Sequence, residues 1–290
     1  MSDLNWTGER LVTQIRDKPG TVEHLHRYAL AMQIVKDKVV LDIASGEGYG
    51  SNLLSYNAKK VYGADISTEA VKHANIKYGK PNLDFVTGST SKIPLADACV
   101  DVVISFETIE HHDEHQLMMN EIKRVLKSNG VLLISSPEKN NYKFRESNNP
   151  YHVKELTLEE FENLLKKNFK YYKIFNQRFV YGSIVNRITD SNNASGFSFF
   201  DGGYLNITNN ISDVDELHCD NIHNKPYFNL ALASEADIDI IPLADTSFFN
   251  AIEVFYKQIE AIRNSHSFRI GNLILKPFSF IKSLTTKLKG

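Results

Sequence analysis

The chain contains 290 residues, 42% of them hydrophobic and 23% charged, with a formal net charge of −2. These values are ordinary for a globular protein, and a charge so close to zero argues against nucleic acid as a partner. The N-terminal residues lack an apolar signal core, no run approaches the ~20 apolar residues of a spanning helix, and the two cysteines form no disulfide framework. We therefore expect a cytoplasmic protein with one large α/β domain or two small ones.

Apolar runs alternate with helical patterns from Lys38 onward. Ser67 is the expected N-cap of one helix, and Thr157 forms an expected capping box with Glu160 at the start of another. The Asn-Gly pair at 129–130 is expected to end the preceding helix, as a C-cap would. Strands are therefore predicted at 38–43, 61–65, 83–86, 101–106, 131–135 and 227–233, and helices at 47–56, 67–78, 115–127 and from 157 onward.

Repeated strand–helix units of this length predict a Rossmann-like, doubly wound, mostly parallel sheet of the α/β class. In such a sheet ligands bind at the carboxyl ends of the strands. A stretch rich in Ser, Asn and Gly after residue 178 predicts a lid or substrate insertion. The expected organisation is an N-terminal cap at 1–35, a core at 36–178, a lid at 179–225, a returning core strand at 226–236 and a helical C-terminal extension with a basic amphipathic tail at 237–290.

A glycine-rich turn follows the first predicted strand, with the spacing Gly46-x-Gly48-x-Gly50. Glycines let the backbone approach a ligand closely, and the following helix offers free N–H donors. Asp42, before the turn, can organise the loop or receive a ligand ammonium. Asp65, at the end of the second strand, can accept both hydroxyls of a ribose. Because the spacing differs from the dinucleotide fingerprint, a nucleoside without a pyrophosphate fits better than NAD.

Five further motifs follow in order along the chain. They are the segment 61–67, the stretch 85–95, the strand 101–106, the Glu110-His111 pair and the segment 124–130. Together with 42–50 they resemble the motifs of class I S-adenosylmethionine-dependent methyltransferases of the type 11 kind. The resemblance implies a seven-stranded sheet, S-adenosylmethionine as the cofactor and methyl transfer as the activity.

The resemblance also implies the cofactor contacts, residue by residue. Asp65 would hold the ribose, Ile66 would lie on one face of the adenine, and Phe106 would border the sulfonium. Ser89 departs from the family, which usually has an acidic residue there; a serine hydroxyl makes a weaker, neutral hydrogen bond to the adenine amino group. The full set of expected cofactor residues is Asp42, Ala44, Gly46, Gly48, Asp65, Ile66, Ser89, Thr90, Ser105, Phe106 and Arg27.

The assignment of Arg27 rests on the segment 23–28, which precedes the first predicted strand. In similar methyltransferases such a segment folds over the cofactor, so Arg27 would pair with the cofactor carboxylate. The alternative is a surface helix with a solvated charged face.

Methyl transfer from a sulfonium is a direct displacement, so the protein must align the acceptor, exclude water and take a proton from a hydroxyl acceptor. A histidine suits the last task because its pKa is near neutrality. His111 follows the fourth strand, and His152 lies just before the capped helix. Glu107 is a third candidate base. For His111 the alternative is a structural hydrogen-bonding role.

Two histidine-rich groups invite a metal interpretation, at 111–115 and at 218–223. Neither has a recognised ligand spacing, and a structural zinc needs four ligands. We therefore expect solvated loop histidines and no metal.

The segment 263–290 has six Lys or Arg and no acidic residue, with apolar residues interspersed. It predicts peripheral contact with an anionic membrane at the inner face, or alternatively a docked helix or dimer contact. It also resembles the C-terminal ends of bacterial surface-polysaccharide enzymes, which favours a sugar hydroxyl on a glycan or activated sugar as the acceptor.

Other interpretations stay open at this stage. A quinone or polyketide methyltransferase has the same core and differs in lid and tail. The chain could instead be a catalytically degenerate binding subunit, which would account for a serine at position 89 in place of the usual acidic residue. A nicotinamide oxidoreductase conflicts with the glycine spacing.

Overall fold

The computed structural model describes residues 19–142, 149–179, 227–243, 247 and 264–265. The predicted lid, apart from its first residue, and the predicted basic tail, apart from two residues, lie outside this range. The expectations on those segments therefore stay predictions.

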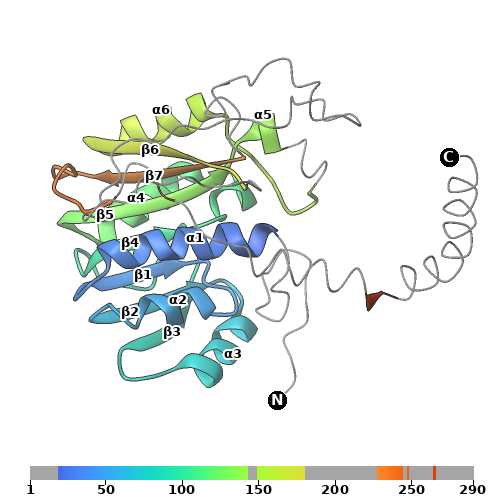
Figure 1. Ribbon diagram of the computed structural model, residues 1–290. Helices are drawn as coiled ribbons and strands as arrows, with labels where there is room; N and C mark the ends of the chain where they lie inside the picture. Colours follow the sequence, from blue (N-terminus) through green and yellow to red (C-terminus); the bar gives the residue numbers. More distant parts are fainter. Residues whose placement is uncertain (1–18, 143–148, 180–226, 244–246, 248–263, 266–290) are drawn as a thin grey trace, which may run out of the picture.

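A seven-stranded sheet forms the centre of the described structure, in the order β3-β2-β1-β4-β5-β7-β6 (Figure 1). β7 runs antiparallel to both of its neighbours, and the other neighbouring pairs are parallel. The predicted mostly parallel α/β sheet is confirmed. The strands are β1 (Val39–Ile43), β2 (Lys60–Asp65), β3 (Leu83–Thr87), β4 (Val100–Ser105), β5 (Leu126–Pro137), β6 (Tyr171–Gln177) and β7 (Phe228–Ser234).

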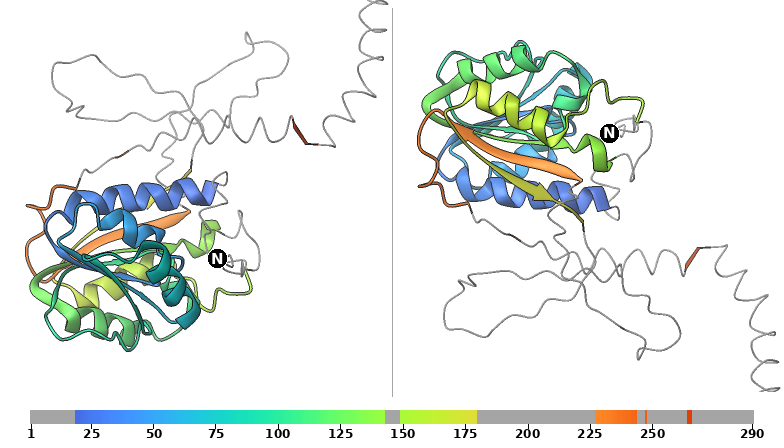
Figure 2. Two further views of the ribbon diagram at one scale, coloured as in Figure 1. Left: turned by 90° about the horizontal axis from the view of Figure 1, so that it is seen from below. Right: turned by 90° about the horizontal axis from the view of Figure 1, so that it is seen from above.

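Helices cover both faces of this sheet (Figure 2). Side chains of α1, α2 and α3 enter the apolar cluster on one face, and those of α4 and α6 enter the cluster on the other. None of the described helices is long and apolar enough to cross a membrane. The helices are α1 (Pro19–Ile34), α2 (Tyr49–Leu54), α3 (Thr68–Tyr78), the 3₁₀ helix η1 (Ile109–His111), α4 (His115–Val125), α5 (Lys139–Tyr142) and α6 (Leu158–Asn168).

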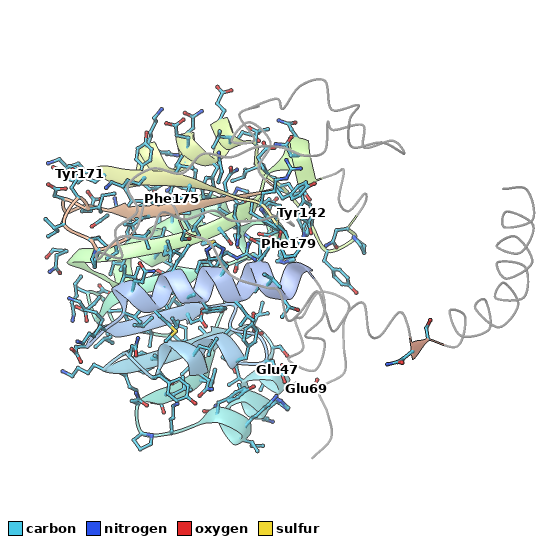
Figure 3. The ribbon with its side chains drawn as sticks, viewed as in Figure 1. Glu47, Glu69, Tyr142, Tyr171, Phe175 and Phe179 are labelled. Atoms are coloured by element: carbon cyan, nitrogen blue, oxygen red, sulfur yellow. The ribbon has the colours of Figure 1, made fainter. Side chains whose placement is uncertain are left out.

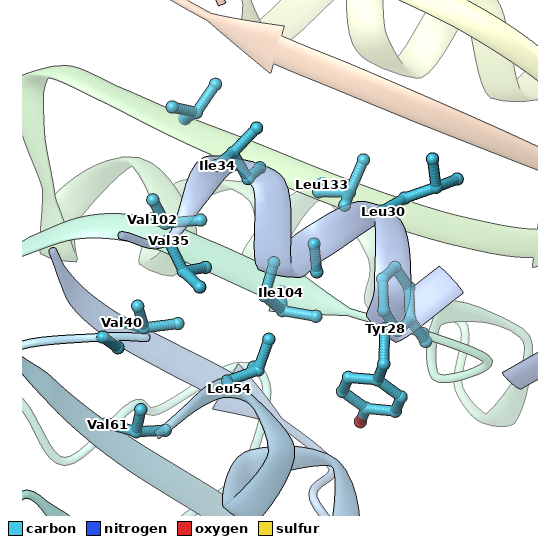
Figure 4. Packing of buried hydrophobic residues seen from close by; sticks show 14 of the residues in the cluster. Tyr28, Leu30, Ile34, Val35, Val40, Leu54, Val61, Val102, Ile104 and Leu133 are labelled. Carbon is cyan, nitrogen blue, oxygen red and sulfur yellow. The ribbon is translucent and has the colours of Figure 1, made fainter. Parts of the chain in front are cut away.

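Neighbouring side chains of the central strands point to opposite faces, as the two-residue strand period requires. On β4, Ile104 enters the cluster beneath α1, whereas Val103 enters the cluster beneath α4. Figure 4 shows Leu30, Ile34 and other α1 side chains against β1, β4 and β5. Since burying one such side chain is worth about 1.5–3 kcal/mol, α1 is a core helix, although it falls within the predicted N-terminal cap.

The predicted helix starts are confirmed. The Ser67 hydroxyl accepts a hydrogen bond from the backbone N–H of Ala70. At α6 the Thr157 hydroxyl accepts from the Glu160 N–H, and the Glu160 carboxylate accepts from the Thr157 N–H. Local hydrogen bonding alone determines these caps, which is why the sequence pattern predicts them well.

The predicted helix end at Asn129-Gly130 is wrong. α4 ends at Val125, and the next residue, Leu126, is already extended and paired with Val100 of β4. Val102 pairs with Val131, so one residue of β4 faces four of β5, and 127–130 form a bulge inside the strand. The buried Leu126 side chain needs the strand to begin early, and the Asn-Gly pair serves the bulge instead of a C-cap.

The sheet order reverses between β1 and β4, and open α/β sheets bind ligands at such a switch point, beyond the carboxyl ends of the strands. Ile43 and Ser105, the last residues of β1 and β4, are register partners. Figure 3 shows Glu47, after β1, at the same edge of the sheet as Tyr142, after β5, with Tyr171 at the opposite edge. The functional residues predicted on different loops therefore converge on one edge.

Candidate active site

The glycine-rich loop after β1 has a backbone that glycine makes possible. Gly46 and Gly48 have φ values of 54° and 89°, and Ala44 also lies at positive φ. The Gly46 N–H donates to the Asp65 carboxylate at 2.8 Å, and the Ser45 N–H donates to the Ala64 carbonyl at 3.0 Å. The loop is thus held against the end of β2, with Gly48 as the N-cap of α2.

We expect Gly48→Ala to lower the free energy of unfolding by about 1–3 kcal/mol, because alanine at positive φ costs ~1–2 kcal/mol and overpacking adds to it. A Cβ at Gly48 would lie 2.7 Å from the Phe85 ring and 2.8 Å from Ala74. Urea unfolding measures the change. Gly20→Ala is the matched control, since nothing lies within 4 Å of its Cβ and alanine favours the α1 helix. Equal stability of Gly48→Ala and wild type would show that a Cβ at this position is tolerated and would contradict the prediction.

Asp65 ties the ends of β1 and β2 together. One carboxylate oxygen accepts from the Gly46 N–H and the other from the Ser67 N–H, both at 2.8 Å. These bonds fix the side chain at the carboxyl end of β2, half-buried. The next residue, Ile66, is 76% exposed, which is unusual for an isoleucine and leaves its side chain available to a ligand.

Asp42 is buried beneath the loop. Its carboxylate accepts from the Ser51 hydroxyl at 2.6 Å and from the Tyr28 hydroxyl at 3.3 Å, so it links β1 with α1 and α2. Burial raises the pKa of Asp42 to about 7, and the hydrogen bonds from Ser51 and Tyr28 oppose that rise. Burial likewise raises the pKa of the Tyr28 hydroxyl. Asp42 therefore organises the loop and its neighbouring helices.

This raised pKa predicts a pH-dependent stability. Between about pH 4 and pH 7 the folded state retains a proton on Asp42 that the unfolded state has lost, so the free energy of unfolding falls as pH rises, by up to ~1.4 kcal/mol per unit. Asp42→Asn should flatten this slope. Urea unfolding of both proteins without ligand, at pH 5 and pH 8, measures the difference. Parallel slopes for the two proteins would contradict a protonated Asp42.

The chain turns sharply after β4, at the carboxyl edge of the sheet. Ser105 is buried and its hydroxyl has no hydrogen-bond partner within the described residues. Glu107 has a φ of 49°, and its carboxylate accepts from the Ser135 hydroxyl at 2.6 Å. The guanidinium of Arg27 lies 3.3 Å from the same carboxylate. Strained positive φ in a non-glycine residue is typical of functional turns.

Arg27 is fully buried, so a solvated charged face is wrong for this part of α1. Its Nη1 donates to Gln177 at 2.9 Å, and the guanidinium lies 4.8 Å from the centre of the Phe228 ring. The Nε and Nη2 atoms have no hydrogen-bond partner within the described residues. Buried N–H donors without partners cost free energy, which a bound anion would recover.

The two candidate histidines are brought together. The His111 and His152 ring centres lie 5.3 Å apart in an edge-to-face arrangement, and Tyr142 stacks on His152. The Nδ1 atom of His152 is 2.6 Å from a Glu155 carboxylate oxygen. Sequence analysis missed Glu155, although its position three residues after a candidate base is a usable signal.

The neighbouring histidines have other contacts. The His112 Nε2 lies 3.2 Å from the Thr90 hydroxyl, and the His115 Nε2 lies 2.8 Å from the His112 carbonyl. Burial lowers the pKa of both imidazoles. Ser89, whose hydroxyl lies 3.4 Å from that of Ser91, is half-buried on the same loop as Thr90. His112 and His115 thus support the turn after β4 and do not join the His111–His152 pair.

Comparison with known proteins shows what the chain is similar to. Residues 41–134 match the model of a methyltransferase domain family. A Mycolicibacterium smegmatis protein named a "probable S-adenosylmethionine-dependent methyltransferase" is 33% identical over 174 residues, which cover 57% of this chain and 65% of that protein. A Mycobacterium tuberculosis protein with the same designation is 34% identical over 128 residues, covering 43% and 46%. The chain thus matches less than two thirds of the length of these relatives.

A solved structure shows the same fold. A chain of the complex between the Haloferax volcanii Trm112 methyltransferase activator and a protein described as a methyltransferase superposes with a TM-score of 0.50 at 19% identity, covering 74% of this chain and 90% of that one. The sheet has a Rossmann-like strand order, residues 41–134 match a methyltransferase domain family, and both relatives are named S-adenosylmethionine-dependent methyltransferases. The roles of individual residues stay predictions.

Proposed function

We propose that the chain transfers a methyl group from S-adenosylmethionine to a hydroxyl of a sugar, on a surface glycan or an activated sugar. The observation that carries the proposal is that a cofactor-binding loop and a pair of candidate bases lie at the same edge of the sheet. The glycine-rich loop and Asp65 suit a nucleoside, and the His111–His152 pair suits a hydroxyl that must lose its proton. The bound cofactor supplies an activated methyl group on its sulfonium.

The described residues fit this cofactor. Asp65 would accept the ribose hydroxyls, and the exposed Ile66 would cover one face of the adenine. The Arg27 Nε and Nη2 atoms, which have no partner within the described residues, would donate to the cofactor carboxylate. Ser105, whose hydroxyl also has no partner there, would border the sulfonium together with Phe106. Ser89 and Thr90 would border the adenine. Of these contacts, those of Arg27 and Ser105 use polar groups that have an unmet hydrogen-bonding capacity within the described residues.

His152 would take the acceptor proton. Its Nδ1 faces the Glu155 carboxylate, which favours the tautomer with the proton on Nδ1 and the lone pair on Nε2. A carboxylate in this position also stabilises the imidazolium that forms when the base accepts a proton. Glu107 is a weaker candidate because Ser135 and Arg27 already engage its carboxylate.

A lipid acceptor is the second candidate. Tyr151 and Val153, which flank His152 in the sequence, are 47% and 63% exposed and offer apolar surface next to the candidate base. A Mycobacterium ulcerans relative, 28% identical over 139 residues, is named a phthiotriol/phenolphthiotriol dimycocerosates methyltransferase. Residues 264–290 would bring either enzyme to an anionic membrane at its cytoplasmic face. Residues 246–262 would pack on the core of the same chain or on a second subunit.

Transfer of a labelled methyl group to separate acceptor pools tests the proposal. The pools are sugar nucleotides, glycolipid extracts, and apolar lipids with quinones. Label in a sugar-bearing pool is the expected result. Label in the apolar pool alone would support methyltransferase activity but contradict a sugar as the acceptor. No label, together with no cofactor binding, would favour a degenerate binding subunit.

A further inference from the structure

We propose that Glu110, His111 and His152 bind a divalent cation of the zinc class at the carboxyl edge of the sheet. This binding goes beyond methyl transfer, and it replaces our expectation that the histidines near 111 are merely solvated. The three residues each offer a ligand atom, and these atoms all lie within 4.8 Å of one another. Glu110 and His111 come from η1, after β4, and His152 comes from the segment before α6.

Outer contacts orient both imidazoles for a metal. The His152 Nδ1 faces the Glu155 carboxylate at 2.6 Å, and the His111 Nδ1 faces the Tyr151 carbonyl at 3.1 Å. Both partners are acceptors, so each Nδ1 carries the proton and each Nε2 carries the lone pair. Metal-binding histidines almost always donate their second ring N–H to a carboxylate or a backbone carbonyl. The two histidines have one partner of each kind.

The ligand set favours zinc over magnesium or calcium. Two imidazoles and one carboxylate are a recognised three-residue set for zinc, with a fourth position left for water or substrate, whereas hard cations require oxygen ligands. Zinc bonds of about 2.0–2.2 Å place tetrahedral ligands roughly 3.4 Å apart. The ligand atoms lie within 4.8 Å of one another, so they approach more closely when the ion binds.

The backbone holds the two contributing segments in place. The Glu110 carbonyl accepts from the Val153 N–H at 2.8 Å and from the Lys154 N–H at 3.0 Å. Tyr142 stacks on the His152 ring at 5.7 Å between centres, which restricts its rotation. Glu110 is 1% exposed and the His152 side chain is 8% exposed, so these two ligands are largely buried, whereas His111 is half-buried. A rigid ligand set of this kind keeps the cost of ordering low on binding.

A cation and a proton compete for the same lone pairs. The ion also occupies the His152 nitrogen that we assign as the base, so zinc is expected to inhibit methyl transfer to a hydroxyl. This consequence rests on the proposed function, whereas cation binding itself does not.

Titration of the full chain with Zn²⁺, followed calorimetrically without cofactor or acceptor, tests the site. We expect binding that weakens at least ~10-fold in His111→Ala and in His152→Ala, and ~10–100-fold in Glu155→Gln, which loses the outer contact. His112→Ala is the matched control, because its ring contacts Thr90 and lies outside the cluster. Unfolding midpoints of all variants exclude loss of fold.

Absence of Zn²⁺ binding would overturn the proposal. Binding that is unchanged in the double variant His111→Ala/His152→Ala would also overturn it, because the ion would then lie elsewhere in the chain. The cobalt absorption spectrum supplies a second readout: loss of tetrahedral bands in His152→Ala supports the site, and their retention contradicts it. None of these outcomes depends on the acceptor, so they remain informative if the methyl-transfer proposal fails.

Discussion

His152→Ala is expected to lower the turnover of methyl transfer by about 10²–10⁴-fold, the usual contribution of a positioned general base. The Glu155 carboxylate at 2.6 Å holds the ring in the tautomer that accepts a proton at Nε2. Cofactor affinity should change little. The contacts between His111 and His152 involve neither the glycine-rich loop nor Asp65. Single-turnover rates and equilibrium binding, measured on the same protein, separate the two effects.

Two further variants make this test specific. Glu155→Gln should lower the rate less than His152→Ala, because the base itself remains and only the carboxylate that orients its ring is lost. Glu159→Gln, an exposed glutamate in the first turn of α6, is the control and should act as wild type. A normal rate in His152→Ala would show that His152 is not the base and would favour His111 or Glu107 instead.

Asp65→Ala is expected to weaken S-adenosylmethionine binding by about 1.5–3 kcal/mol, the worth of hydrogen bonds to a charged group. The carboxylate has two tasks, since it would accept the ribose hydroxyls and it already accepts from the Gly46 and Ser67 N–H groups. Its loss therefore removes a ligand contact and loosens the loop that receives the cofactor. Isothermal calorimetry measures the change in dissociation constant.

The neighbouring strand offers a matched control for Asp65. Asp84 lies on β3, with its side chain 55% exposed and paired with Lys60 at 2.6 Å. Asp84→Ala removes a carboxylate of the same kind from the same sheet and should leave cofactor affinity unchanged, because exposed ion pairs contribute little. Equal affinities for Asp65→Ala and wild type would remove Asp65 from the cofactor site.

Local patterns predicted most of the fold. Short apolar runs located β1 and β4, and the side chains of Ser67 and Thr157 located the starts of α3 and α6. These features depend on residues within a few positions of one another. The Asn129-Gly130 pair failed as a helix end because its conformation depends on pairing of β5 with β4, which is a contact between distant parts of the chain.

Long-range contacts also explain what the sequence did not reveal about the site. The burial of Arg27 follows from Gln177 and Phe228, which lie 150 or more residues away in the chain. The resemblance places His111 and His152 near the same site, but their ring contact depends on the hydrogen bonds from the Val153 and Lys154 N–H groups to the Glu110 carbonyl. Single motifs identify residue types suited to a task, whereas tertiary structure decides which of them meet.

Equilibrium binding of S-adenosylmethionine and of NAD to the full chain tests the central claim most directly. The glycine spacing, the two hydrogen bonds to Asp65 and the Arg27 N–H groups that lack a partner within the described residues predict saturable one-to-one binding of S-adenosylmethionine and no binding of NAD. Binding of NAD, or of neither ligand, would contradict a methyltransferase site at this edge of the sheet.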